Sequence, residues 1–482
     1  MRNRSWLILL VTLAGCTLGP HYNPPYIDNP DDWRVTLADA HGSINVDWWV
    51  QFDDDVLVHL IDTSLWGNQD LLAAKYRVDE FLGLYRVTRA DLYPQIAGNA
   101  EYCREKISSD ITQLFPGVKN PENIYQVLLT GTWEIDIWGK LRRATEAACR
   151  DLLAAEENRL TVVQTLVSSV ALAYINLLKL DRQLEIAIET AKSRGKTLEL
   201  FQKRFAAGVI SKIDLSQIES QYQEALATIP DFEQRIERQE NAISVLMGKS
   251  SEPIPRGRTL HTLNLPEVPS GIPSQLLLQR PDIRAAEQEL AAATARIAVA
   301  RAEYFPTLSL TGAYGASSNE LSTLFTSGAN VWSYCAPVSM PIFTAGRIAG
   351  QVKATEAFRN QLLATYRQRI LEALQDVNDS LIVFQKRREQ EEEQRKQVES
   401  LQVYARLARL RYDEGYASYL EVLDAERSLF NVQLQYSETY ANLFQALVAL
   451  YRSLGGGWIY IADPMTECFI DREPVQEYFD IP

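Results

Sequence analysis

The chain is 482 residues long, more than one compact core usually holds, so the sequence predicts several units or one elongated structure. Hydrophobic residues make up 46% of it and no apolar run approaches the roughly 20 residues of an apolar transmembrane helix, so any membrane passage is expected to use strands. The net charge of −14 argues against nucleic acid or anionic lipid as the main partner and suits a protein that lines an aqueous path.

The N-terminus has the organisation of an export signal. Residues 1–4 are basic, and residues 6–14 form an apolar stretch that is too short to span a membrane. The following Leu-Ala-Gly-Cys at residues 13–16 resembles the bacterial lipobox, in which the cysteine thiol receives diacylglycerol. We therefore expect a covalent lipid on Cys16, and no other cofactor, with the alternative that Ala-Gly is an ordinary cleavage site. Thr17, the residue after the cysteine, resembles the sorting signal of lipoproteins that are sent to the outer membrane.

Four further cysteines lie at Cys103, Cys149, Cys335 and Cys468, without paired spacing. The sequence therefore predicts neither a disulfide framework nor a CxxC metal site. Cys103 and Cys335 fall in segments interpreted below as strands, where a thiol acts as a small apolar side chain. The histidines lack metal-ligand spacing and no nucleophile motif or phosphate loop is present, so we expect no metal site, no catalytic residue and no enzymatic activity.

The chain contains an internal repeat. Asp70 matches Asp282 within similar segments, and Pro94 matches Pro306 with the same separation in the sequence, which we name the first offset. Beyond these prolines a slightly shorter separation, the second offset, persists for more than a hundred residues. Pairs that match at the second offset are Gly139 with Gly346, Arg204 with Arg411, Gly208 with Gly415, Ser211 with Ser418, and Glu219 with Glu426. Two equal structural units are therefore predicted.

Each repeat reads as helix, strand, strand, long helix, helix. Both long helices occupy the roughly 69 residues between two matched glycines, so each would be about 100 Å long. A heptad seam runs along the first from Leu160 through Val163, Val167, Val170, Tyr174 and Leu177 and is expected to continue through Leu184 and Ile188. The second repeat has a similar seam, with Leu420, Leu423, Phe430, Leu434, Phe444, Val448 and Tyr451. The shorter helices are expected over residues 56–92, 212–247, 274–305 and 417–454.

Four segments alternate apolar and polar residues, as half-buried strands do. They cover residues 95–107, 123–135, 307–316 and 330–341, with Tyr and Trp for the membrane interfaces. Each is close to the length of a tilted membrane strand, which has roughly 9 to roughly 11 residues. Four strands cannot close into a barrel, and an open edge in lipid leaves backbone groups unpaired. Three copies would supply twelve strands and an open pore, so we expect a homotrimer.

The sequence divides into six segments on this interpretation. They are a signal peptide (1–15), a lipidated strap (16–55), the first repeat (56–248), an equatorial linker (249–273), the second repeat (274–456) and a C-terminal tail (457–482).

Several motifs together resemble the TolC-like outer-membrane efflux proteins, specifically the NodT-like lipoprotein branch that serves RND-type pumps. The motifs lie at residues 16–20, at residues 280–287 (Arg-Pro-Asp-Ile-Arg-Ala-Ala-Glu), at residues 341–347 and at residues 411–426. The resemblance implies a mainly α protein with membrane β. It would be a trimeric, twelve-stranded β-barrel in the outer membrane of a Gram-negative-type cell, continuous with a long antiparallel helical barrel in the periplasm.

The same resemblance implies a function as the exit duct of a tripartite efflux system, with a periplasmic adaptor and an inner-membrane pump as partners and outer-membrane lipid around it. The channel gate would involve Arg411, Tyr412 and Asp424, and Gly208 and Gly415 would mark the tips that contact the adaptor. The alternative is a structural or adaptor-type periplasmic coiled-coil lipoprotein without a pore. Such a protein would lack the paired aromatic strands that precede Gly139 and Gly346.

Overall fold

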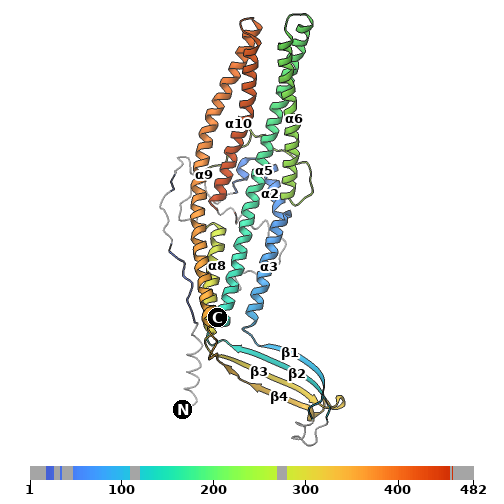
Figure 1. Ribbon diagram of the computed structural model, residues 1–482, viewed down its shortest axis with the longest axis vertical. Coiled ribbons are helices and arrows are strands. Elements are labelled where there is room, and N and C mark those ends of the chain that lie inside the picture. Colours follow the sequence, from blue (N-terminus) through green and yellow to red (C-terminus); the bar gives the residue numbers. More distant parts are fainter. Residues whose placement is uncertain are drawn as a thin grey trace. The chain divides into compact units, whose positions relative to one another are not determined.

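The computed structural model describes residues 18–26, 33–34, 47–108, 120–268, 279–455 and 459 (Figure 1). The chain divides into two compact units. The first comprises Met1–Tyr26, Arg77–Glu156 and Ala285–Arg367, and the second comprises Ile27–Tyr76, Glu157–Arg284 and Gln368–Pro482. Each unit contains segments of both sequence repeats, so a compact unit is not one repeat.

The first unit contains an antiparallel sheet with the strand order β1-β2-β3-β4. The strands are β1 (Gln95–Glu105), β2 (Glu122–Ile135), β3 (Thr307–Ser318) and β4 (Asn330–Cys335), and β5 (Val338–Ser339) pairs with β3 as a continuation of β4. All four predicted strands are therefore present. The last is shorter than expected because Ala336 and Pro337 interrupt it, and proline has no N–H for a strand ladder.

The two faces of this sheet differ in polarity, as the strand register shows. One face is apolar and aromatic, with Ile96, Tyr102, Tyr125, Val127, Leu129, Trp133, Leu308, Leu310, Tyr314, Trp332 and Tyr334. The other face is polar, with Asn99, Glu101, Gln126, Thr130, Thr132, Glu134, Ser309, Thr311, Ser317 and Ser333. The exposed apolar side chains on the first face are those that a membrane-facing surface requires.

The strap residues that the structure describes in the first unit pack on helices. The hydroxyl of Tyr22 donates to Glu287 Oε1 over 3.1 Å, on α8 (Pro281–Ala302). Burial raises the pKa of Tyr22 well above its ordinary value, and Glu287 raises it further. His21 contacts the buried guanidinium of Arg143. These contacts fix the strap against helices from both repeats.

The first short helix of the sequence prediction is two helices in the structure. α2 (Asp55–Gly67) and α3 (Gln69–Ala90) are separated by Asn68, which has an extended conformation. Its side-chain oxygen accepts from Leu71 N over 3.0 Å, and its side-chain nitrogen donates to Leu246 O over 2.9 Å. The predicted single helix over residues 56–92 was wrong because Asn68 caps α3 and binds the end of another helix.

The long helices have the predicted length. α5 (Lys140–Ala206) and α9 (Arg347–Asp413) have 67 residues each, and the returning helices are α6 (Lys212–Leu246) and α10 (Tyr419–Ser453). Short 3-10 turns lie at Val50–Phe52, Leu321–Thr323 and Ser327–Ala329. A stretch of α5 is apolar and long enough to span a membrane, contrary to the sequence expectation. Most of it is buried, as in the core helix of a soluble protein.

The predicted seam of α5 is confirmed as far as Leu177, where all its members are buried. Past Asp181 the buried positions change to Ile186, Ala187 and Ala191, and the predicted Ile188 is exposed. A straight helix drifts relative to a seven-residue repeat, so the seam moves to neighbouring positions. In α10 the predicted Leu420 is likewise exposed.

Two of the linker residues, Gly257 and Arg258, lie beside Asp54 in the second unit. One carboxylate oxygen of this residue accepts from Val56 N and Leu57 N at the start of α2. The other accepts from the Tyr174 hydroxyl on α5 over 3.0 Å and from Arg258 N over 2.8 Å. Asp54 therefore joins a helix start, the long helix and the linker at one point.

A half-buried charged side chain, Arg280, joins the helix ends of this unit. Arg280 donates to Ser453 O over 3.1 Å at the end of α10 and pairs with Asp282 and Asp376. Burial alone would raise the pKa of Asp282, but the hydrogen bond from Arg280 holds it below the ordinary value. The Arg-Pro-Asp motif thus has a structural role. Residues 269–278 and most of the C-terminal tail lie outside the described residues.

Candidate functional site at the two helical turns

The two long hairpins of the second unit end in equivalent turns. Gly208 has φ +71° and Gly415 has φ +79°, the left-handed conformation that favours glycine at a helix end. The backbone N–H of Val209 donates to Arg204 O over 2.9 Å, and that of Tyr416 donates to Arg411 O over 2.8 Å. Both predicted tip glycines therefore close the same type of turn, one in each repeat.

An aromatic cluster joins the two hairpins next to these turns. Phe201 at the end of α5 is buried, and its ring lies 4.4 Å from that of Tyr419 and 6.1 Å from that of Tyr412, between centroids. Tyr412 and Tyr419 meet edge to face at 5.1 Å. Burial raises the pKa of Tyr419 well above its ordinary value, so its hydroxyl stays neutral. Aromatic pairs of this kind contribute about 0.5 to 1.5 kcal/mol each beyond the area they bury.

Arg204 completes the contact between the hairpins. Its guanidinium donates to the Tyr412 hydroxyl over 2.5 Å and lies 5.6 Å from the centre of the Tyr412 ring and 5.5 Å from that of Phe201. A hydrogen bond from a charged donor contributes more than a neutral one, and the ring faces attract the cation. We name Phe201, Arg204, Tyr412 and Tyr419 the hairpin latch.

Each of the predicted gate residues has a partner within this chain. Arg411 pairs with Glu421 Oε1 over 2.7 Å within its own hairpin, and Asp424 pairs with Arg427 over 3.5 Å. Neither Arg411 nor Tyr412 contacts Asp424 in the hydrogen bonds and ion pairs of the described residues. The role of these three residues in gating stays a prediction.

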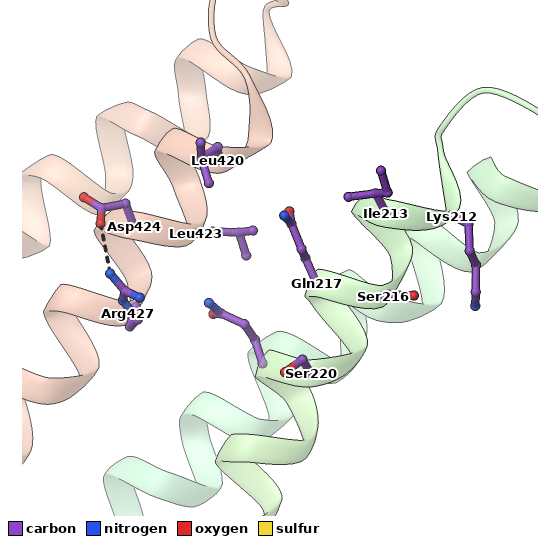
Figure 2. Close-up of a pocket in the computed structure, with 10 residues that line it drawn as sticks. Lys212, Ile213, Ser216, Gln217, Ser220, Leu420, Leu423, Asp424 and Arg427 are labelled. Carbon is purple, nitrogen blue, oxygen red and sulfur yellow. Dashed lines mark hydrogen bonds and ion pairs between the residues drawn. The ribbon is translucent and has the colours of Figure 1, made fainter.

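Asp424 borders a groove of about 630 Å³ between the first turns of α6 and α10 (Figure 2). Leu423 and Gln217 point toward each other across the groove, whereas the Asp424 carboxylate points away from α6 toward Arg427 (Figure 2). The remaining lining residues are Lys212, Ile213, Ser216, Ser220, Gln221 and Leu420. The hairpins are therefore in contact at the latch and apart at the groove.

A buried arginine and a half-buried glutamate line one pocket on the side of the turns that faces the middle of the helices. Arg194 on α5 is buried and donates to the backbone oxygen of Gln221 over 2.7 Å, with its guanidinium 5.3 Å from the Phe430 ring centre. Glu426 on α10 lines the same pocket of about 390 Å³. Burial raises the pKa of Glu426, while Arg409 and Arg194 lower it, with burial the larger effect. α5, α6 and α10 are thus held together by polar as well as apolar contacts.

The sequence interpretation missed Arg204 and Phe201, although a signal was present. Arg204 matches Arg411 at the second offset, so the role predicted for Arg411 in the second repeat was also a possible role for Arg204 in the first. Cys16 and Thr17 lie outside the described residues. No group of His, Cys, Asp or Glu among the described residues has a metal-binding arrangement.

Comparison with known proteins places these features in a family. The chain matches the family described as outer membrane efflux protein over residues 60–249 and 272–456. It is 34% identical over 463 residues to the solvent efflux pump outer membrane protein SrpC of Pseudomonas putida, with 94% of this chain and 97% of that protein covered. It is 35% identical over 456 residues to the probable outer membrane lipoprotein SilC of Salmonella typhimurium, with 93% and 97% covered.

Solved structures agree with this assignment. A crystal structure of CusC, whose title refers to folding and transmembrane channel formation, has a TM-score of 0.81 at 31% identity and covers 92% of this chain and all of that one. The family match includes both sequence repeats, and the similarity to SrpC and SilC extends over nearly the whole length. The chain is therefore a member of the outer membrane efflux protein family.

Proposed function

We propose that the protein is the outer-membrane exit duct of a tripartite efflux system, a trimer that passively conducts substrates from an inner-membrane pump and a periplasmic adaptor to the cell exterior. The observation that carries this proposal is the four-stranded sheet with one aromatic face and two edges, attached to two helical hairpins. Three such sheets close into a barrel of twelve strands, which gives every edge strand a partner in the membrane.

The role is that of a conduit and not of an enzyme. Its family and its relatives are named for efflux. The polar face of the sheet would line the aqueous pore, and its apolar face would contact lipid. An acidic chain with a net charge of −14 is compatible with a water-filled path.

The hairpin tips are the proposed contact with the adaptor. Val209 and Ile213 are exposed apolar residues beside the first turn, and Tyr416 and Leu420, which match them at the second offset, are exposed beside the second turn. A trimer would present six such apolar tips. Helical hairpins of an adaptor can bury apolar side chains of this kind, because exposed apolar surface favours association.

Lipidation of Cys16 would hold the chain at the outer membrane. The name of its relative SilC includes the word lipoprotein, and residues 13–16 resemble a lipobox. We expect a clickable fatty acid to label the wild-type protein and not the Cys16→Ala variant. We further expect the variant to fractionate with periplasmic protein or to assemble poorly, because one lipid-bearing residue tethers a chain without spanning the bilayer. Label on the variant would exclude Cys16 as the attachment site.

The proposed function is tested by oligomeric state and conductance together. The purified protein, treated with an amine-reactive crosslinker in detergent, should give a three-chain species, and planar bilayers should show ion-conducting channels. An unboiled gel should show a trimer that boiling dissociates. A monomer or dimer without conductance would support instead a periplasmic coiled-coil lipoprotein without a pore.

A further inference from the structure

Two cysteines lie on the two edge strands of the sheet. Cys103 is on β1 and Cys335 is on β4, and both are exposed. Two strands lie between them, and the register places Cys335 level with Gln95 on β1, far along that strand from Cys103, so within one chain the two are too far apart for a disulfide. In the trimer of the proposed function, on which this inference depends, β4 of one copy pairs with β1 of the next.

The repeat predicts the register of that pairing. β1 and β3 begin directly after Pro94 and Pro306, which define the first offset, and the starts of α5 and α9 are separated by the second offset. The strand pair β1–β2 and the strand pair β3–β4 have the same register when their residues are matched at these offsets. Asn99 pairs with Leu128 in the first, and the corresponding residues Thr311 and Cys335 pair in the second.

The junction between two copies corresponds to the β2 to β3 junction inside one chain. There Leu128 lies directly opposite Gly315. Cys335 corresponds to Leu128 at the second offset, and Cys103 corresponds to Gly315 at the first offset. We propose that Cys335 of each copy faces Cys103 of its neighbour and that the two form an intersubunit disulfide, so that three such bonds close the barrel covalently.

The backbone geometry of β4 favours a cross-strand pair of the type that a disulfide can bridge. The N–H of Ser309 donates to Pro337 O over 3.1 Å, so Pro337 directs its carbonyl toward β3. Residues two apart in an antiparallel strand direct their N–H and C=O groups to the same side, so those of Cys335 also point toward β3. At the outer edge of β4, Cys335 and the residue opposite it on the neighbouring copy therefore form a pair without backbone hydrogen bonds. In such pairs the Cα atoms are about 4.5 Å apart and the side chains are close, within the range that a disulfide spans.

Both thiols also lie on the polar face of the sheet. Cys103 Sγ donates to Glu101 Oε1 over 3.0 Å, and Cys335 follows Ser333 on its strand. This face would line the water-filled pore, where a soluble oxidant can reach a thiol. A side chain on the opposite face would be in lipid.

The reaction is thiol–disulfide exchange with an external disulfide compound or protein as the oxidant. The two thiols lose two protons and two electrons to form one S–S bond, and the S–S bond of the oxidant breaks to give two thiols. Proteins exported from the cytoplasm meet an oxidising compartment where such bonds persist. The earlier interpretation of Cys103 and Cys335 as apolar residues of strands would then be incomplete.

The test is a non-reducing gel of boiled samples, in which only covalent species survive. Wild-type membranes treated with oxidised glutathione should give two-chain and three-chain bands that a reductant removes. Cys103→Ser and Cys335→Ser should each abolish both bands. Cys149→Ser, a variant of the partly buried thiol on α5, should retain them.

Coexpression of the two serine variants tests whether Cys335 of one chain pairs with Cys103 of another. A Cys103→Ser chain has only Cys335 on its edge, and a Cys335→Ser chain has only Cys103, so together they should restore a two-chain band. Failure of that band, or wild-type protein that stays reduced while the amine-reactive crosslinker still gives a trimer, would overturn the cysteine pairing alone. Absence of a trimer with the amine-reactive crosslinker would instead contradict the proposed function.

Discussion

Arg204→Ser is expected to raise the current of the closed channel in planar bilayers several-fold. The reason is that Arg204 is the charged member of the hairpin latch, donating to Tyr412 and contacting two ring faces. A charge-assisted hydrogen bond and a cation–π contact together are worth about 2 kcal/mol, and each 1.4 kcal/mol is tenfold in an equilibrium constant. If opening parts the two hairpins of each chain, three weakened latches favour the open state.

The matched control is Arg411→Ser, which removes the equivalent arginine of the second repeat. Arg411 pairs with Glu421 inside one hairpin, and its side chain is 56% exposed, so its loss should change the current less. Tyr412→Phe removes only the hydroxyl acceptor and should give an intermediate increase. An unboiled gel confirms that each variant is a trimer. A current for Arg411→Ser that exceeds that of Arg204→Ser would place the gate away from the latch.

Structural elements that depend on residues close together in the sequence could be predicted from it. The strands follow from period-two alternation, and the turns follow from glycines that adopt positive φ, so both were found at nearly the observed residues. The length of the long helices followed from two matched glycines in each repeat. These features depend on neighbouring residues, and the sequence contains that information directly.

Features that depend on distant partners were missed or misassigned. The break at Asn68 needs the carbonyl of Leu246, which is 178 residues away, and the contact of Arg204 with Tyr412 spans 208 residues. The change of seam in α5 depends on which helices pack beside it. The proposed cysteine pair requires the strand register and a second chain, neither of which cysteine spacing reveals.

Asp54 illustrates how one buried side chain can connect segments that sequence patterns treat separately. It precedes α2, and its other partners are Tyr174 in the middle of α5 and Arg258 in the linker. The same side chain leaves no room beside the linker, since a Cβ atom on Gly257 would clash with its Oδ1. This part of the second unit is therefore specified by a polar network and not by the heptad seam alone.

Asp54→Ala is accordingly expected to lower the free energy of unfolding by about 3 to 5 kcal/mol. The variant loses the cap of α2 and leaves the Tyr174 hydroxyl and the Arg258 N–H without their carboxylate acceptor. Asp54 is only 2% exposed, so water cannot easily replace the lost acceptor. Denaturant unfolding of the detergent-solubilised protein, followed by circular dichroism, measures the change. The matched control is Asp55→Ala, which removes the adjacent, exposed carboxylate in the first turn of α2 and should change stability by less than about 1 kcal/mol. Equal midpoints for the two variants would show that the Asp54 network does not stabilise the fold.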